Sequence, residues 1–140
     1  MFSTLMKRVA VSSLLTCSAM AVADQSDYKL MVIDQSTQAT VDTNRQYELA
    51  FNQCALSVQA KNFTEAETLC SKAISLLSKS KVPAYKRREL TSFALSNRGV
   101  SRMMANNDAA GLSDFYEAAQ IADSVMVSHN LSRAKENLSL

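Results

Sequence analysis

The 140-residue sequence has few residues that interrupt helices. It contains two glycines, one proline and no tryptophan, and aromatic residues make up 6% of it. Glycine and proline are the residues least suited to a helix interior, and runs of β-branched residues are also few. This scarcity leaves little room for a fold built on many tight turns. Because Ala, Leu, Ser, Lys and Glu are abundant, the composition predicts an all-α fold.

Histidine is nearly absent, because His129 is the only one in the chain. A Ser-His-acid or Cys-His system would have to use this residue, and the sequence places no partner beside it. The chain also has no glycine-rich phosphate loop, paired-histidine metal motif or dinucleotide fingerprint. The sequence therefore predicts that the protein is not an enzyme and has no catalytic residues, metal site or cofactor.

An excess of positive charge is also missing once the leader described below is removed. The full chain has 15 basic and 13 acidic residues, and the loss of Lys7 and Arg8 leaves 13 of each. A neutral chain lacks the long-range field that draws proteins to nucleic acid, so no nucleic-acid partner is expected. One local basic cluster is typical of a solvated turn and helix face, although it could contact an acidic partner. Its members are Lys79, Lys81, Lys86, Arg87 and Arg88.

The chain lacks an apolar run long enough to span a bilayer. Residues 9–20 are apolar or small, about a dozen against the roughly 20 that a membrane helix needs. They follow a basic start and precede Ala-Val-Ala at 21–23, the pattern of a secretory signal peptide cut after Ala23. We expect a periplasmic or secreted protein with no permanent membrane span. A lipoprotein signal ending at Cys17 is the alternative, and Thr16 disfavours it because a small unbranched residue is usual there.

The remaining 117 residues are enough for one domain. Residues 24–42 form an N-terminal arm or loosely ordered segment, whose apolar run at 28–33 is either strand-like or irregular. Residues 43–140 show helical periodicity. Thr43 and Gln46 predict a capping box at the first helix, and Asn62 with Glu65 predicts a cap on the second. The expected helices run from 43 to the break at 61–62, from there to the break at 79–82, over about 84–105, from the turn at 106–108 to about 122, and over about 125–138.

The helical region contains an internal repeat in which four positions recur 45 residues later with the same mutual spacing. Small residues at two of them let the helices of a hairpin approach closely, and a sulfur or an aromatic ring fills the space beside them. The matched pairs are Cys54 with Gly99, Ala66 with Gly111, Cys70 with Phe115, and Ala73 with Ala118.

The segment 92–125, with its Asn-Arg-Gly, Asn-Asn-Asp and Gly-x-x-x-Phe-x-x-Ala patterns, resembles a unit of the tetratricopeptide repeat (TPR) family. The segment 47–80, with Asn-Phe-Thr-Glu-Ala at 62–66 and Ala73, resembles another. The resemblance implies about two helical hairpins with the last helix as a solvating cap. The chain departs from the family at Leu95, Arg102 and Asp123, and its 45-residue period exceeds the family's 34. A HEAT-like array is the alternative, since its period is near 45.

A disulfide between Cys54 and Cys70 is expected, because these are the only cysteines left after the leader is removed and the repeat places them in facing helices. The pair lacks the Cys-x-x-Cys arrangement of redox-active thiols. Reduced, inert thiols are the remaining alternative.

The resemblance implies a concave surface made by the first helix of each unit, and this face is the candidate for binding a protein or peptide partner. Its members are Phe51, Ala55, Val58, Phe93, Asn97, Val100, Met103 and Met104. Methionines beside aromatic residues suit adaptable apolar recognition, but the same residues could bury one another or lie under the arm. Because Phe51 and Ala55 replace the polar residues of a carboxylate clamp, such a clamp is not predicted.

The sequence thus predicts an exported, disulfide-linked interaction module of the cell envelope. A structural or assembly subunit, a HEAT-like scaffold and a lipid-anchored adaptor remain alternatives. The sequence predicts neither the identity of the partner nor the oligomeric state.

Overall fold

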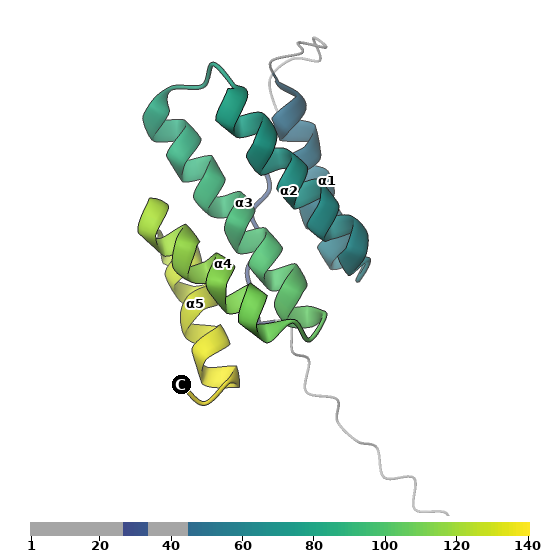
Figure 1. Cartoon of the computed structure of the whole chain (residues 1–140), viewed down its shortest axis with the longest axis vertical. Coiled ribbons are helices and arrows are strands. Elements are labelled where there is room, and N and C mark those ends of the chain that lie inside the picture. Colours follow the sequence, from purple (N-terminus) through teal and green to yellow (C-terminus); the bar gives the residue numbers. More distant parts are fainter. Residues whose placement is uncertain (1–26, 34–44) are drawn as a thin grey trace, which may run out of the picture.

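The computed structural model describes residues 27–33 and 45–140. This part of the chain is all helical apart from its connecting segments, which confirms the predicted fold class (Figure 1). The leader, the cleavage point after Ala23 and the capping residue Thr43 lie outside the described residues. The helices are α1 (Gln46–Gln59), α2 (Phe63–Lys79), α3 (Ala84–Met104), α4 (Asp108–Ile121) and α5 (Val125–Asn137).

The helix ends agree with the sequence patterns except at the starts of α1 and α2. The N-cap of α1 is Arg45, which makes no side-chain cap bond, so the predicted capping box from Thr43 to Gln46 is wrong because Gln46 is already the first residue of the helix. Asn62 is the N-cap of α2 as expected, but its side chain does not bond the helix backbone. Its Nδ2 instead donates to Oε2 of Glu65 at 2.7 Å, so the predicted pair forms between two side chains. Ser124 caps α5 by accepting from the Val127 backbone N–H at 3.2 Å.

α1, α3 and α5 end in the same turn. Two residues after each helix, the chain adopts the left-handed conformation, at Lys61, Asn106 and Ser139 with φ of 60°, 60° and 56°. The next residue donates its N–H to the carbonyl five positions back, which is the hydrogen bond of a Schellman cap. These bonds are Asn62 to Ser57 (2.9 Å), Asn107 to Arg102 (2.8 Å) and Leu140 to Lys135 (3.0 Å). α5 therefore ends in the same way as the first helix of each hairpin, and it has the position that the first helix of a third hairpin would take.

The helices pack as successive antiparallel hairpins. α1 packs on α2 and α3 packs on α4, while α2 also contacts α3 and α4 contacts α5. α1 and α5 each touch α3, so the three helices with the shared turn lie next to one another. This is a repeat-like arrangement. In Figure 1 the described arm residues run behind α3, on the side of the bundle away from α2 and α4.

The two hairpins are joined at equivalent positions by different contacts. In the first hairpin Cys54 and Cys70 form a disulfide with a Cα–Cα distance of 5.0 Å, as predicted. In the second, a Cβ placed on Gly99 would lie 2.7 Å from the Phe115 ring and 3.1 Å from the Gly111 carbonyl oxygen. The glycine therefore lets the helices approach closely enough for the buried ring of Phe115 to fit. Ala66, Ala73 and Ala118 are also fully buried at these crossings.

A charged network connects α2, α3 and α4. Asp114, with a side chain only 3% exposed, accepts from Arg98 at 2.8 Å and from Arg102 at 2.9 Å. Arg102 also donates to Glu67 at 2.6 Å, and Arg98 to Ser71 at 3.0 Å. The hydrogen bonds to Asp114 raise the pKa of Arg98 above its ordinary value, so Arg98 stays charged. Arg102, where the TPR pattern favours an aromatic residue, thus takes part in an ion pair.

Removing the disulfide should destabilise the fold without changing its helix content. Replacing Cys54 and Cys70 with alanine should lower the free energy of unfolding by about 3 kcal/mol, because a crosslink spanning a loop near this length restricts the unfolded chain. Denaturant unfolding measures the loss, and circular dichroism measures the helix content. Wild-type protein treated with reductant is the matched control and should show a similar loss. Two titratable thiols in the unreduced, folded protein would contradict the crosslink.

Asp114→Asn should destabilise the fold by about 2–4 kcal/mol, because it leaves the largely buried guanidinium group of Arg98 without a carboxylate and Arg102 with Glu67 alone. Glu89→Gln removes the exposed partner of Lys86 and is the control, with an expected loss below about 0.5 kcal/mol. Denaturant unfolding measures the loss of stability in both variants. Equal losses would contradict the claim that the buried carboxylate of Asp114 stabilises the fold more than the exposed carboxylate of Glu89.

Candidate functional site

The candidate site is a groove across α1, α3 and α5 that is occupied by residues 27–33 of the same chain, here called the arm. One asparagine on each helix bonds the arm: Asn52 on α1, Asn97 on α3 and Asn130 on α5. We call these three side chains the asparagine row. The arm lies across the row with its N-terminal end at α5 and its C-terminal end at α1.

Each asparagine makes two hydrogen bonds to one arm residue. Its side-chain oxygen accepts from the backbone N–H, and its side-chain nitrogen donates to the backbone carbonyl of the same residue. The distances are 2.8 and 2.8 Å between Asn130 and Lys29, 3.0 and 2.8 Å between Asn97 and Met31, and 2.7 and 3.0 Å between Asn52 and Ile33. This is the pairing that a neighbouring strand makes in an antiparallel sheet. The row therefore binds the backbone of the arm and not its side chains.

The bonded residues alternate along the arm. Only in an extended chain do the N–H and C=O groups of every second residue face the same side. The described arm is neither a regular helix nor a strand. Residues 27–33 are an extended segment held by side chains. The other residues of the predicted arm, 24–26 and 34–42, lie outside the described residues.

The asparagine row depends on the arm for its own hydrogen bonds. Asn97 and Asn130 are 0% exposed, and leaving a buried amide without partners costs about 1–3 kcal/mol. Both bonds of Asn97 in this groove go to Met31. Asn130 bonds Lys29 and also donates to Oγ of Ser96 at 2.9 Å. The arm thus completes a polar floor in a region that is otherwise apolar.

Four arm side chains pack into the apolar walls of the groove. Met31 and Ile33 lie against the cluster that contains Phe51 and Leu90. Tyr28 and Leu30 lie against a second cluster, which contains Phe115. Val32 points outward and is 52% exposed. The arm is therefore held by apolar contacts as well as by backbone bonds.

Tyr28 fixes the N-terminal part of the arm. Its ring stacks on Phe115 with centroids 5.8 Å apart, and its hydroxyl accepts from Asn137 at 3.0 Å. Burial raises the pKa of Tyr28 above its ordinary value of about 10, which the bond from Asn137 partly offsets. Because docking favours the neutral phenol, the arm should bind less strongly as the pH rises above about 10. A hollow of about 130 Å³ beside this ring is lined in part by Met103 and Met104.

The single histidine also holds the arm. Nε2 of His129, on α5, lies 2.8 Å from the carbonyl oxygen of Asp27 and donates to it. Arg133, one turn further along α5, lies 3.9 Å from the Asp27 carboxylate. His129 therefore has a structural contact at the start of the arm.

The predicted partner-binding face coincides with this groove. Five of its residues are almost fully buried in the isolated chain, Met103 is 8% exposed, and Phe93 and Met104 are partly buried. Only Asn97 among them hydrogen-bonds the arm. The almost fully buried members are Phe51, Ala55, Val58, Asn97 and Val100.

The sequence reasoning missed Asn52 and Asn130. A signal for them was present, because each asparagine of the row is followed two positions later by a small residue: Cys54, Gly99 or Ser132. Asn52 also precedes Asn97 by 45 residues, the repeat distance found for the cysteines. Asn130 follows Asn97 by 33 residues, so a search at a single period does not find it.

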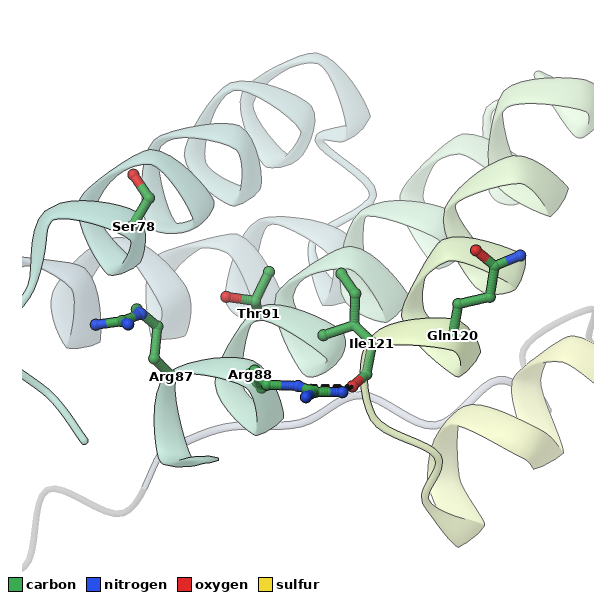
Figure 2. A pocket seen from close by; sticks show the side chains of 6 residues that line it. All are labelled: Ser78, Arg87, Arg88, Thr91, Gln120 and Ile121. Carbon is green, nitrogen blue, oxygen red and sulfur yellow. Dashed lines mark hydrogen bonds between the residues drawn. The ribbon is translucent and has the colours of Figure 1, made fainter. Parts of the chain in front are cut away.

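A second depression lies on the opposite side of the bundle, among α2, α3 and α4 (Figure 2). It has a volume of about 580 Å³ and is lined by residues of the predicted basic cluster. Arg88 bonds the Ile121 carbonyl oxygen at 2.8 Å, and Arg87 lies 3.3 Å from that of Val82. Lys86 pairs with Glu89. These three cations are engaged within the chain, as in a solvated helix face.

No family model matches the chain, and neither does any curated protein sequence or solved structure. Residues 27–33 and 45–140 contain no group of three or more His, Cys, Asp or Glu placed to hold a metal ion. Within the same residues, no helix has both the length and the apolar character needed to cross a bilayer.

The asparagine row predicts an alternating pattern of amide protection in the arm. The N–H groups of Lys29, Met31 and Ile33 should exchange slowly with solvent, whereas those of Leu30 and Val32 should exchange quickly. Hydrogen exchange followed by NMR measures each amide.

Asn97→Ala should speed exchange at Met31 about tenfold, which corresponds to the loss of about 1.4 kcal/mol of hydrogen bonding. Gln53→Ala, at an exposed position of α1, is the control and should leave the pattern unchanged. Uniform protection along the arm, or none, would contradict the proposed geometry.

Proposed function

We propose that this protein is an exported, non-catalytic interaction module of the cell envelope that binds an extended segment of a partner protein in the groove across α1, α3 and α5. The observation that carries the proposal is the asparagine row. Three side-chain amides, spaced to meet alternate residues, form a surface suited to the backbone of an extended chain. The arm demonstrates that such a segment fits.

The polarity of the groove floor supports binding over simple packing. Two asparagines that are 0% exposed make most of their bonds to a seven-residue segment instead of to the helices around them. If the groove served only to bury the arm, an apolar floor would be enough, because apolar side chains need no hydrogen-bond partners from outside the bundle. Amides that bond only backbone groups also accept segments of different sequence, which suits recognition of a partner.

The disulfide supports the proposed export. Structural disulfides persist mainly in oxidising compartments such as the bacterial periplasm or the extracellular space. The signal peptide read from residues 1–23 agrees with such a location, and we propose a periplasmic or secreted protein on these two grounds.

We also propose that the chain is a divergent TPR protein. The turns at Lys61, Asn106 and Ser139 repeat in the three first helices. The last two are 33 residues apart, close to the family's period of 34, whereas the first two are 45 apart. A longer first unit followed by a unit of ordinary length accounts for both distances. α5 is then the first helix of an incomplete third unit.

A structural or assembly subunit is the second candidate, and one observation favours it. The predicted binding face is covered by the arm in the isolated chain, as expected if the groove serves only to hold that arm. The two candidates differ in whether any other chain enters the groove.

Photo-crosslinking in the native envelope distinguishes these candidates. A crosslinking amino acid placed at Met104, beside the Tyr28 end of the groove, should capture a discrete partner. Asn97→Ala is tested in a chain that also carries Met31→Pro, so that the arm has already lost its bonds to Asn97 and the added change weakens only the partner. In that chain the adduct should be strongly reduced by Asn97→Ala, because the partner loses two backbone bonds. The same crosslinker at Tyr85, an exposed residue of α3, is the control. An adduct that is also formed from Tyr85, or that Asn97→Ala leaves undiminished in the Met31→Pro chain, would contradict binding in the groove.

A further inference from the structure

We propose that the arm is a displaceable occupant of the groove, which competes with the partner and resembles it chemically. The partner segment would then be an extended, largely apolar peptide without proline at the three alternate positions bound by the asparagine row. This inference rests on the proposed function, because it states what that groove selects and what opposes binding.

The exclusion of proline follows from the hydrogen bonds. Asn52, Asn97 and Asn130 each accept from an arm N–H, and proline has none. A proline at any of these positions would also leave the asparagine oxygen without its donor. The row does not exclude proline at the positions in between, because it bonds neither Leu30 nor Val32.

The apolar character follows from the walls of the groove. Tyr28, Leu30, Met31 and Ile33 pack against the two apolar clusters, whereas the side chain of Val32 is half exposed. A partner segment therefore needs apolar side chains at the four matching positions. Polar residues can occupy the other positions, where the arm itself has Lys29. An aromatic ring in place of Tyr28 would stack on Phe115 in the same way.

The arm is held firmly enough to compete and loosely enough to leave. None of its seven residues is fully buried, and three of them are exposed. Segments with few buried contacts open at low free-energy cost while the rest of the fold stays intact. Its departure would leave the disulfide and the Gly99–Phe115 contact of the two hairpins in place, although Phe115 would lose the stacked ring of Tyr28.

The connection to α1 makes the arm an intramolecular competitor. Twelve residues separate Ile33 from the start of α1 at Gln46, and Asn52 lies about 9 Å along that helix. A chain of this length can extend to roughly 40 Å, so it can both reach the groove and release it. A short tether gives an effective concentration of the order of millimolar. A free peptide must overcome this concentration to bind.

Competition between the arm and a synthetic peptide tests the proposal. The probe is a fluorescent peptide with the sequence of residues 27–33, and its binding to the full chain is followed by fluorescence anisotropy. Met31→Pro removes the backbone N–H that donates a hydrogen bond to Asn97, and it should release the arm from the groove. Val32→Pro is the matched control, because the row does not bond Val32 and the chain before it is already extended. Both changes lie outside the helices.

The expected result is that Met31→Pro protein binds the probe at least tenfold more tightly than either the unchanged protein or the Val32→Pro protein. A probe with proline in place of Met31 should bind none of them. Equal affinity in the unchanged and Met31→Pro proteins would overturn the competition and leave groove binding intact. Failure of the probe to bind any of the three proteins, with helix content unchanged, would overturn both the competition and the proposed groove function.

Discussion

The fold around the groove depends on the pairing of asparagine side chains with an extended backbone. Without the arm, the amides of Asn97 and Asn130 would lose most of their hydrogen bonds in an apolar surrounding. Without the row, the arm would keep its half-buried side chains and the polar contacts at Asp27 and Tyr28, but no hydrogen bond from the row to its backbone. Each pair resembles one step of a β-ladder, but the second strand is replaced by single residues from three helices. The spacing of those helices must therefore match the spacing of alternate residues in an extended chain.

Two of the helices that carry the row, α1 and α3, are each held in a hairpin by a different contact at equivalent positions. The first hairpin uses the disulfide between Cys54 and Cys70, and the second uses the close approach of Gly99 to Phe115. The carboxylate of Asp114 adds a charged link next to the second contact. Phe115 serves both purposes, because its ring fills the space at Gly99 and also supports Tyr28 of the arm. Packing between the helices is thus coupled directly to the occupied groove.

Local patterns in the sequence were sufficient to predict the helices and the disulfide. Apolar residues at three- and four-residue steps marked the helices, and the matched spacing of Cys54 and Cys70 with Gly99 and Phe115 placed the crosslink. The arm contacts were not predictable in the same way, because they join residues up to 109 positions apart. Asparagine inside a helix has no local signature of its role, and the unequal distances on either side of Asn97 conceal the row from a search for one period.

The position of Asn130 on the last helix has a consequence for the order of folding. The arm is near the beginning of the chain, yet the site for Lys29 is complete only when α5 has formed. During synthesis, the helices of both hairpins can assemble while the arm has no finished site to enter. Long-range contacts of this kind form late, since the chain between them must first be ordered. The arm precedes all five helices in the chain, yet among the described segments it is the last to reach its place, where it contacts both the first helix and the last.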